Sequence, residues 1–421
     1  MSLPGRNLTG ASAKAIVAVF ALSFLITIAI RVRTDVIHPG SPTWDLPYDH
    51  HKYLYVATHP LGSFHIQPTC WRIGVPLTTR LLPFSAYRSF DILTIFFLAL
   101  SGGLVYVWLL AIPRSPTEAL LGVFLFYSLG GASKLVLQGV TSPDPESFFF
   151  ILLGLYAIYK GYDWLFVLSL AVGVVAKETV LLIAPLYYSL KAEKLWDWPR
   201  IKRTVIVCLP GVCVLAAIHI LIPAWNDRPD YVASLPAIYT QVSGGYTKYD
   251  LKTAIFGTTH YEMYREMSSI NLLRLFSYGS LGMQLFLPFF APRANKEALI
   301  RWAPYWLPTI ASLFFALNPD RRLCSLFPVL IIMGLNGLNV LAERLKVPLS
   351  QFTVLFAIIT ALLLMKKDTP IVPFDLVAAT FLAGLCWMVA RRPRSLTPAY
   401  GGAEAPTPHG RAVKQVAEKL P

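Results

Sequence analysis

Blocks of apolar residues, most of them about 17–25 residues long, recur along the whole chain and constrain its fold more than any other feature. A block of this length crosses the hydrocarbon core of a bilayer as an α-helix. Lipid offers the backbone no hydrogen-bond partners, so a segment inside it must bond to itself, as a helix does. The blocks predict an all-α, polytopic transmembrane helical bundle of about 12 spans, within a range of about 10–13. We expect these spans near residues 14–31, 90–112, 117–138, 146–159, 163–176, 178–190, 203–223, 274–290, 302–317, 323–341, 349–365 and 374–390.

The composition excludes a soluble domain and argues against nucleic acid as a partner. Hydrophobic residues make up 55% of the 421 residues and charged residues only 14%, whereas soluble domains carry about 25% charged residues. The net charge of +14 fits basic cytoplasmic loops that contact lipid headgroups, because the basic residues lie in short loops without an RNA- or DNA-binding motif. The five cysteines are scattered without a CxxC pair, which argues against a disulfide framework or a cysteine metal site.

One apolar stretch, residues 164–190, is interrupted only by Lys177 and Glu178. A single helix here would place both charges at the bilayer centre. It would also put the basic residues 191–203 outside, although basic short loops prefer the cytoplasm. Two helices of about 14 residues, each about 21 Å long at 1.5 Å per residue, avoid both problems. We therefore predict a hairpin whose vertex, at Lys177 and Glu178, lies in a recess below the outer membrane surface.

This topology places both termini in the cytoplasm. The basic segments 191–203, 291–301 and 391–421 then lie inside, as basic segments prefer. The predicted organisation is a cytoplasmic segment (1–12), a transmembrane domain (13–390) and a cytoplasmic tail after residue 391. The tail is rich in Pro, Gly and Arg and is expected to be disordered.

Two long loops, loop A (residues 32–88) and loop B (residues 225–272), are expected on the external side. Both hold too many aromatic and apolar residues for plain linkers, and long loops in compact proteins are usually functional. Short helices lying on the membrane surface are expected near residues 50–58, 74–82 and 259–275.

Loop A carries two carboxylates four residues apart, Asp45 and Asp49, with His50, His51 and Tyr53 beside them. Either acid could act as a general base on a hydroxyl group that attacks next to a phosphate leaving group. The segment also fits a solvent-exposed turn, because Asp-Leu-Pro is ordinary turn chemistry. Asp49 and the two histidines could bind a metal ion, although adjacent residues rarely hold one ion without distant partners.

Other charged residues fall on the external side of the same topology. Asp144, in a Ser-Pro-Asp-Pro turn, is an acidic candidate, or it simply begins a helix. Ionisable residues at membrane depth favour a function. We therefore expect Lys177 to bind a phosphate, with a structural pair between Lys177 and Glu178, or snorkelling, as the alternative. Arg321 and Arg322 could clamp a phosphate or contact headgroups. Further candidates are Lys134 for a phosphate and His260 for a sugar or lipid.

Four segments, in this order, resemble motifs of the GT-C superfamily of polytopic glycosyltransferases, especially bacterial members of the dolichyl-phosphate-mannose transferase type. YDHHKYLYVA at 48–57 resembles the acidic start of the first external loop, and TCWRIGVPL at 69–77 resembles the Y-R-x-L-x-P segment that follows, with Trp in place of Tyr. SPDP at 142–145 resembles the D-P turn before the fourth span. VAKET at 175–179 resembles the T-K-E turn before an L-x-x-P run. The resemblance covers most of the membrane region and excludes the tail.

The resemblance implies an inverting transfer of a hexose or pentose, such as mannose, from a polyprenyl- or dolichyl-phosphate donor to a glycan, lipid or protein acceptor outside. Asp49 would be the base, with Asp45 as the alternative because His50 stands where the family often has Gly or Glu, and Asp144 would be a second acidic group. It implies no cofactor, and a divalent cation stays open. It places the protein among the lipids of a bacterial cytoplasmic membrane. The groups expected around the substrate and its phosphate are Lys177, Glu178, Arg321, Arg322, Arg72, Lys134, His50, Tyr53 and His260.

Two non-enzymatic functions compete with this interpretation. A transporter or a flippase for a lipid-linked substrate would also explain the spans and the intramembrane charges, but such proteins more naturally show paired broken helices in repeated halves. This sequence has one such break, at Lys177 and Glu178, and no visible repeat. A structural subunit of a membrane complex is the other alternative.

Overall fold

The computed structural model describes residues 12–41, 49–192, 194, 196–225, 228–236, 282–312, 323–362 and 374–390. The residues described there contain helices, turns and bends but no β-strand. The α-helices are α1 (Ala13–Val32), α2 (Asp49–Thr58), α3 (Gly74–Arg80), α4 (Ala86–Ala111), α5 (Pro116–Ser128), α6 (Lys134–Gln138), α7 (Asp144–Lys160), α8 (Asp163–Ala176), α9 (Ala184–Ser189), α10 (Trp198–Leu221), α11 (Pro229–Ser234), α16 (Pro292–Ala311), α18 (Phe327–Leu345), α19 (Leu349–Leu362) and α20 (Phe374–Ala390). The 3₁₀ helices are η1 (Thr69–Trp71), η2 (Glu178–Ile183), η4 (Gly282–Leu285) and η5 (Leu287–Phe290).

Four of these helices, α1, α4, α10 and α18, are long and apolar enough to cross a membrane. Helices α8, α19 and most of α20 are apolar but shorter. The prediction of an all-helical fold is therefore confirmed for the described residues, and these four helices are candidate membrane spans. The count of about 12 spans stays a prediction.

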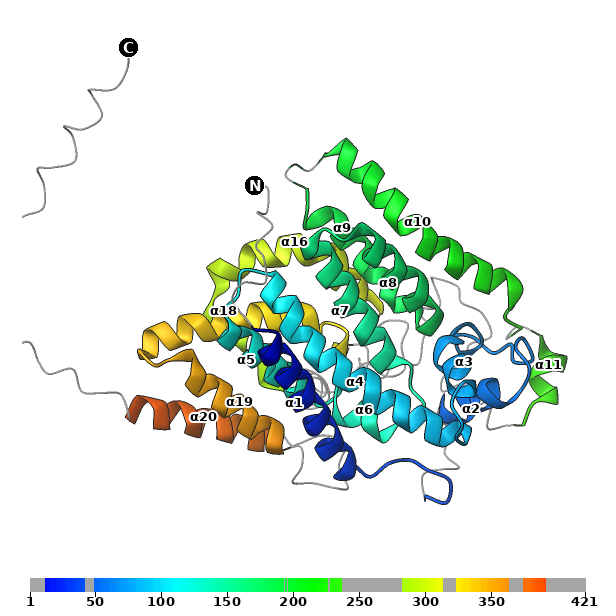
Figure 1. Ribbon diagram of the computed structural model, residues 1–421, viewed down its shortest axis with the longest axis horizontal. Helices are drawn as coiled ribbons and strands as arrows, with labels where there is room; N and C mark the ends of the chain where they lie inside the picture. Colours follow the sequence, from blue (N-terminus) through cyan, green and yellow to red (C-terminus); the bar gives the residue numbers. More distant parts are fainter. Residues whose placement is uncertain are drawn as a thin grey trace, which may run out of the picture.

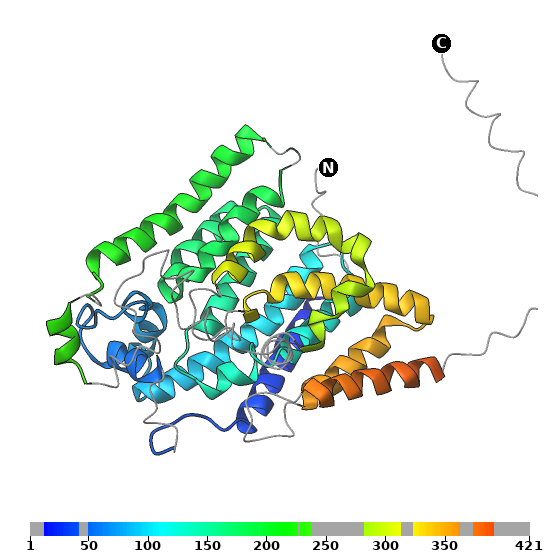
Figure 2. The same ribbon diagram turned by 180° about the vertical axis from the view of Figure 1, so that it is seen from behind.

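Helix α4 lies in the middle of one half of the bundle, where it packs against α1, α5 and α7 (Figures 1 and 2). Helix α8 covers α7, and α10 packs on α8 at the edge. On the other side, α5 contacts α18 and α19, and α20 packs on α19. Edge-to-face contacts between aromatic rings fill the centre. The ring of Phe327 lies 5.3 Å from that of Phe126 and 5.4 Å from that of Phe148.

Helix α10 has the exposure pattern of a lipid-facing span. Val207, Gly211 and Ile218 lie on the stripe that packs against the bundle and are its buried residues. Large apolar side chains point away from the protein, among them Ile206 at 62% and Ile220 at 78% exposure. A helix that exposes this much apolar surface is stable in contact with hydrocarbon rather than water.

The predicted break at Lys177 and Glu178 is present. Helix α8 ends at Ala176, Lys177 is extended, and the chain continues as η2 and α9. The chain also turns back here, because the hydroxyl group of Tyr187 in α9 donates a hydrogen bond of 2.6 Å to Asp163 at the start of α8. The two arms therefore form a hairpin with Lys177 at its vertex.

Two predicted spans are wrong in detail. The span 117–138 is not continuous, since α5 ends at Ser128 and α6 begins at Lys134. The intervening Gly130 and Gly131 lower helix propensity, which accounts for the interruption. In the span 274–290, the described part is the pair of 3₁₀ helices η4 and η5.

The basic segment 291–301, expected between the spans 274–290 and 302–317, forms the first half of α16, so the later span begins earlier than predicted. Pro292 at the first helical position favours a helix start. The basic side chains of the segment 291–301 are compatible with a helix at the membrane boundary. The expected surface helix near 259–275 and the tail 391–421 lie outside the described residues.

Candidate active site

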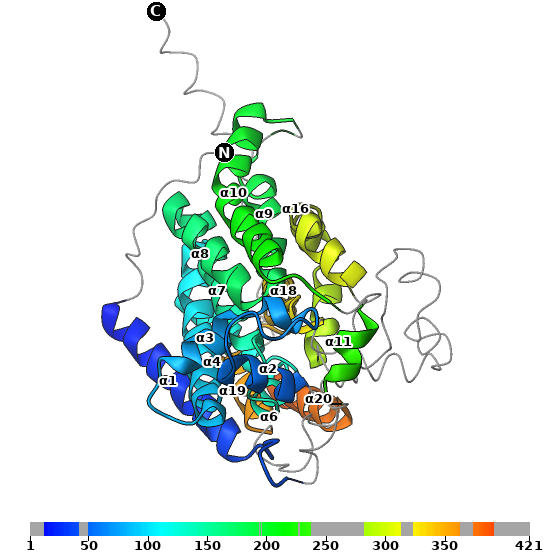
Figure 3. The same ribbon diagram turned by 90° about the vertical axis from the view of Figure 1, so that its right-hand side faces the viewer.

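The described part of loop A contains α2, η1 and α3, which lie at the end of the bundle where α7 begins and α8 ends, as seen from that side in Figure 3. The helices predicted near residues 50–58 and 74–82 are α2 and α3. Helix α3 approaches the vertex of the hairpin very closely. A Cβ atom at Gly74 would lie 2.9 Å from the backbone N and Cα of Ala176, so glycine permits this packing.

Asp144 is held at the start of α7 by local hydrogen bonds. Pro145 occupies the first turn, where its missing N–H group costs nothing. The hydroxyl group of Ser142 donates a hydrogen bond of 2.5 Å to Oδ2 of Asp144, and the hydroxyl group of Ser147 donates one of 2.7 Å to the Asp144 carbonyl oxygen. The Asp144 side chain is 1% exposed.

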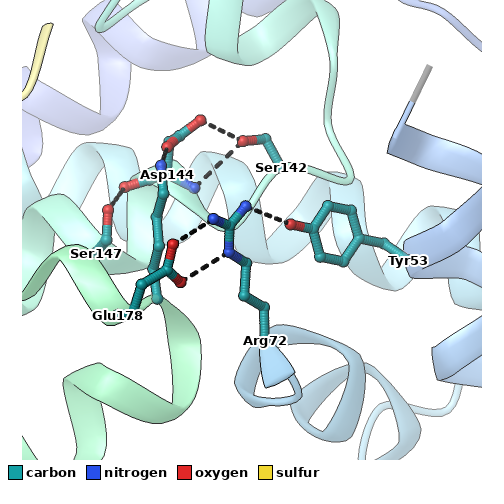
Figure 4. A network of polar contacts seen from close by, with 7 residues as sticks. Tyr53, Arg72, Ser142, Asp144, Ser147 and Glu178 are labelled. Carbon is teal, nitrogen blue, oxygen red and sulfur yellow. Dashed lines mark hydrogen bonds and ion pairs between the residues drawn. The ribbon is translucent and has the colours of Figure 1, made fainter. Parts of the chain in front are cut away.

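Lys177 donates a hydrogen bond to Oδ1 of Asp144, and the two form an ion pair (Figure 4). The lysine side chain is 4% exposed, so both charges are withdrawn from water. A buried charge is tolerated when it is paired and hydrogen-bonded, and removing one partner strands the other. The pair joins the start of α7 to the vertex of the α8–η2 hairpin. The alternative partner considered for Lys177, the adjacent Glu178, instead faces Arg72.

Arg72 joins loop A to the same vertex (Figure 4). Its guanidinium group donates two hydrogen bonds to the carboxylate of Glu178, one of them 2.9 Å from Nε to Oε2, and a third of 3.2 Å from Nη1 to the hydroxyl group of Tyr53. Burial alone would lower the pKa of Arg72, but the charge of Glu178 and the bond to Tyr53 outweigh it and hold the pKa well above its usual value. Arg72 is therefore charged and closely surrounded.

Asp49 begins α2, where a carboxylate favours the positive end of the helix dipole. Its side chain is 39% exposed and lies 3.5 Å from the ammonium group of Lys52. His50 is buried and its ring lies 4.1 Å from that of His51. Among the candidate acids in the described residues, Asp49 is thus far more accessible to a substrate than Asp144.

Lys134 is fully buried at the start of α6, which packs against α1 and α4. Asp45, Arg321, Arg322 and His260 lie outside the described residues.

Sequence reasoning missed Glu146. It lies in the first turn of α7, is 6% exposed, and its Oε2 atom is buried without a hydrogen-bond partner. An unsatisfied buried carboxylate oxygen is costly and is often retained at functional sites. The signal in the sequence was an acid two residues after Asp144, which also fits the ordinary preference for acids in a first helical turn.

The arrangement brings three distant segments to one end of the bundle: loop A, the start of α7 and the hairpin vertex. It offers an accessible carboxylate at Asp49, a buried ion pair at Asp144 and Lys177, and a guanidinium group at Arg72. These groups suit proton transfer and the recognition of a negative charge. Among the described residues, no three His, Cys, Asp or Glu side chains gather as metal ligands would.

Comparison with known proteins gives similarity to solved structures only. No family model and no curated protein matches the chain. An oligosaccharyltransferase from Archaeoglobus fulgidus, solved with a tethered acceptor peptide containing the NVT sequon, matches with 12% identity and a TM-score of 0.45. The match covers 90% of this chain and 55% of that one, so this chain spans about half the length of that protein. Similarity at this level does not establish a shared fold.

Proposed function

We propose that this chain is a GT-C-like membrane glycosyltransferase. It would transfer a hexose or pentose from a polyprenyl- or dolichyl-phosphate donor to an acceptor hydroxyl group on the external side. The observation that supports this most is the network of Figure 4, in which the four segments that carry the resemblance meet through contacts of Tyr53, Arg72, Asp144 and Lys177 with Glu178 and Ser142.

Asp49 is the proposed general base. Its carboxylate would take the proton of the acceptor hydroxyl group as that oxygen forms a bond to the anomeric carbon of the donor. The bond between this carbon and the phosphate oxygen breaks, and its electron pair leaves with the lipid phosphate. Attack from the face opposite the phosphate inverts the anomeric centre. The 39% exposure of Asp49 leaves room for an acceptor to approach. Asp45 stays the alternative base.

The leaving phosphate gains one negative charge during the reaction, so the site must supply a cation. Among the described residues, Lys177 is the proposed cation. In the structure it is bonded to Asp144, and the growing phosphate charge would draw it partly from that partner. Asp144 would then position the acceptor. Arg321, Arg322 and Lys134 are proposed to extend the positive site, with His50 and His260 near the sugar.

The test measures release of polyprenyl phosphate from radiolabelled polyprenyl-phosphate mannose in proteoliposomes. Asp49→Asn should lower the rate by at least about 100-fold, because the amide cannot accept the proton. Asp35→Asn is the matched control, since Asp35 is an exposed carboxylate of the same loop, and it should leave the rate unchanged. Full activity in Asp49→Asn would transfer the role of base to Asp45.

A transporter or flippase would behave differently in the same vesicles. It would move the intact lipid-linked sugar between leaflets without cleaving it, so the radiolabelled donor would stay intact. Movement of the intact donor without release of polyprenyl phosphate would contradict the proposed reaction.

A further inference from the structure

We propose that Arg72 is a positioning residue that holds α2, and with it the proposed base Asp49, against the hairpin vertex. The inference rests on the proposed function for the identity of the group that is positioned. The docking of α2 against the hairpin vertex is inferred from contacts alone.

Each of the three guanidinium nitrogens of Arg72 donates a hydrogen bond to a protein group (Figure 4). Nε and Nη2 bond to the carboxylate of Glu178, and Nη1 bonds to the hydroxyl group of Tyr53 at 3.2 Å. The residue is 5% exposed. A planar guanidinium group that binds a carboxylate through two parallel bonds has a fixed orientation. Arg72 is therefore arranged to connect protein groups.

Tyr53 carries the connection to the proposed base. It lies in α2 four residues after Asp49, so the two side chains emerge from the same side of the helix. Tyr53 is 1% exposed and packs with Val75 of α3 and Phe90 of α4. A displacement of Arg72 would therefore move Tyr53 and, one helical turn away in α2, Asp49.

Neighbours of Arg72 dock the same short segment onto other elements. Trp71 donates a hydrogen bond of 2.9 Å to the carbonyl oxygen of Ile222, and its ring stacks on His219 of α10 at 3.8 Å. Gly74 packs on Ala176. These contacts place residues 71–74 at the vertex, whereas Arg72 adds the polar bond from that segment to α2.

A native cysteine reports on this docking without any substrate. Cys70 is 1% exposed and packs with Val56 of α2 and with Ile222 beyond α10. Burial raises the pKa of its thiol to about 12, and the charge of Arg72 lowers it in part. Loss of the Arg72 charge alone would therefore raise the pKa further and slow modification. Faster modification can only mean that the segment has opened.

The first experiment labels Cys70 with a maleimide in a variant whose other four cysteines are replaced by Ser or Ala. Arg72→Gln should increase the labelling rate by at least about 10-fold. The control is Arg31→Gln, which removes another two-bond pair, from Arg31 to Asp91 at 2.7 and 2.8 Å, between α1 and α4. It should leave Cys70 protected. Unchanged labelling in Arg72→Gln, or equal labelling in both variants, would overturn the inference.

The second experiment separates positioning from phosphate binding. Arg72→Gln should lower kcat by about 100-fold with little change in the KM of polyprenyl-phosphate mannose, since a displaced base slows the reaction step. Tyr53→Phe keeps the Glu178 pair but cuts the bond to α2. It should lower kcat by about 10-fold while Cys70 stays protected. A raised KM with unchanged kcat would assign Arg72 to the phosphate instead.

The two experiments fail independently. If the wild-type protein transfers no sugar, the proposed function is wrong, yet Cys70 labelling still decides whether Arg72 docks loop A. Arg72→Lys is a conservative variant. It keeps the charge but lacks the planar fork, so partial protection and partial kcat are expected, between those of wild type and Arg72→Gln.

Discussion

Lys177 and Asp144 neutralise one another in a buried setting, with side chains 4% and 1% exposed. Lys177→Met would leave the Asp144 carboxylate buried without its cation. We expect a loss of about 3–5 kcal/mol in the free energy of unfolding, because a stranded charge keeps its desolvation cost. Denaturant unfolding in detergent micelles measures it.

The double variant Lys177→Met with Asp144→Asn is the informative comparison. It removes both charges, so most of the lost stability should return while transfer stays abolished. Lys296→Met, at an exposed position of α16, should change stability by no more than about 0.5 kcal/mol. If Lys177→Met is as stable as wild type, Lys177 and Asp144 do not form the buried ion pair seen in the structure.

At the residue scale, the sequence identified candidate charged side chains, but it did not predict which side chain each of them contacts. Lys177 and Glu178 were expected near the substrate because ionisable residues are costly at membrane depth. Asp144 was expected there from its Ser-Pro-Asp-Pro turn, and Arg72 from the family resemblance. The partners of Lys177 and Arg72 depend on how segments 33 and 106 residues apart in sequence dock. Helical periodicity contains no information about that docking.

At the scale of elements, the contact of α3 with the hairpin depends on the absence of a side chain. Gly74→Ala would place a Cβ atom 2.9 Å from the Ala176 backbone, which cannot rotate away as a side chain could. We expect a loss of about 1–3 kcal/mol and faster labelling of Cys70. Gly139→Ala is the matched control, since a Cβ atom there meets nothing within 4 Å. Equal stability of the two variants would contradict the close packing.

Helix α18 and the segment η5 form a second close contact. A Cβ atom at Gly337 would overlap the carbonyl group of Leu287, whereas one at Gly334 would have its nearest neighbour, a Leu287 methyl group, at 3.4 Å. Gly337→Ala should therefore cost about 2–3 kcal/mol, and Gly334→Ala should cost less than about 1 kcal/mol. Thermal unfolding of both variants in the same detergent compares them. A larger effect at Gly334 would contradict the packing of η5.

Most elements could be predicted because the lengths of the apolar segments, and the charged and turn-forming residues between them, indicate where helices begin and end. The break at Lys177 and the helices of loop A followed from charges and aromatic residues in otherwise apolar or turn-rich sequence. The segment 282–290 is apolar and was expected as a span. It instead forms 3₁₀ helices, and its close contact with α18 depends on Gly337, which lies 47 residues or more from it in sequence. Local pattern alone could not reveal this tertiary effect.

At the scale of the whole molecule, α10 connects the two ends of the bundle. Its 24 residues reach about 36 Å at 1.5 Å per residue, which exceeds the roughly 30 Å hydrocarbon core. The exposed Trp196 lies just before it, and Ile222 at its far end accepts the hydrogen bond from Trp71 of loop A. If α10 crosses the membrane, loop A and Trp196 must lie on opposite sides.

The predicted orientation follows from charge, because the basic residues near Trp196 prefer the cytoplasm. It can be tested with single cysteines at Leu61 and at Trp196, which are 49% and 80% exposed, in a background without the native cysteines. A membrane-impermeant maleimide should label Leu61→Cys in intact cells and Trp196→Cys only after permeabilisation. Both positions are exposed, so labelling reports the side of the membrane and not burial. The reverse pattern would place the candidate site in the cytoplasm, and labelling of both in intact cells would show that α10 does not span the bilayer.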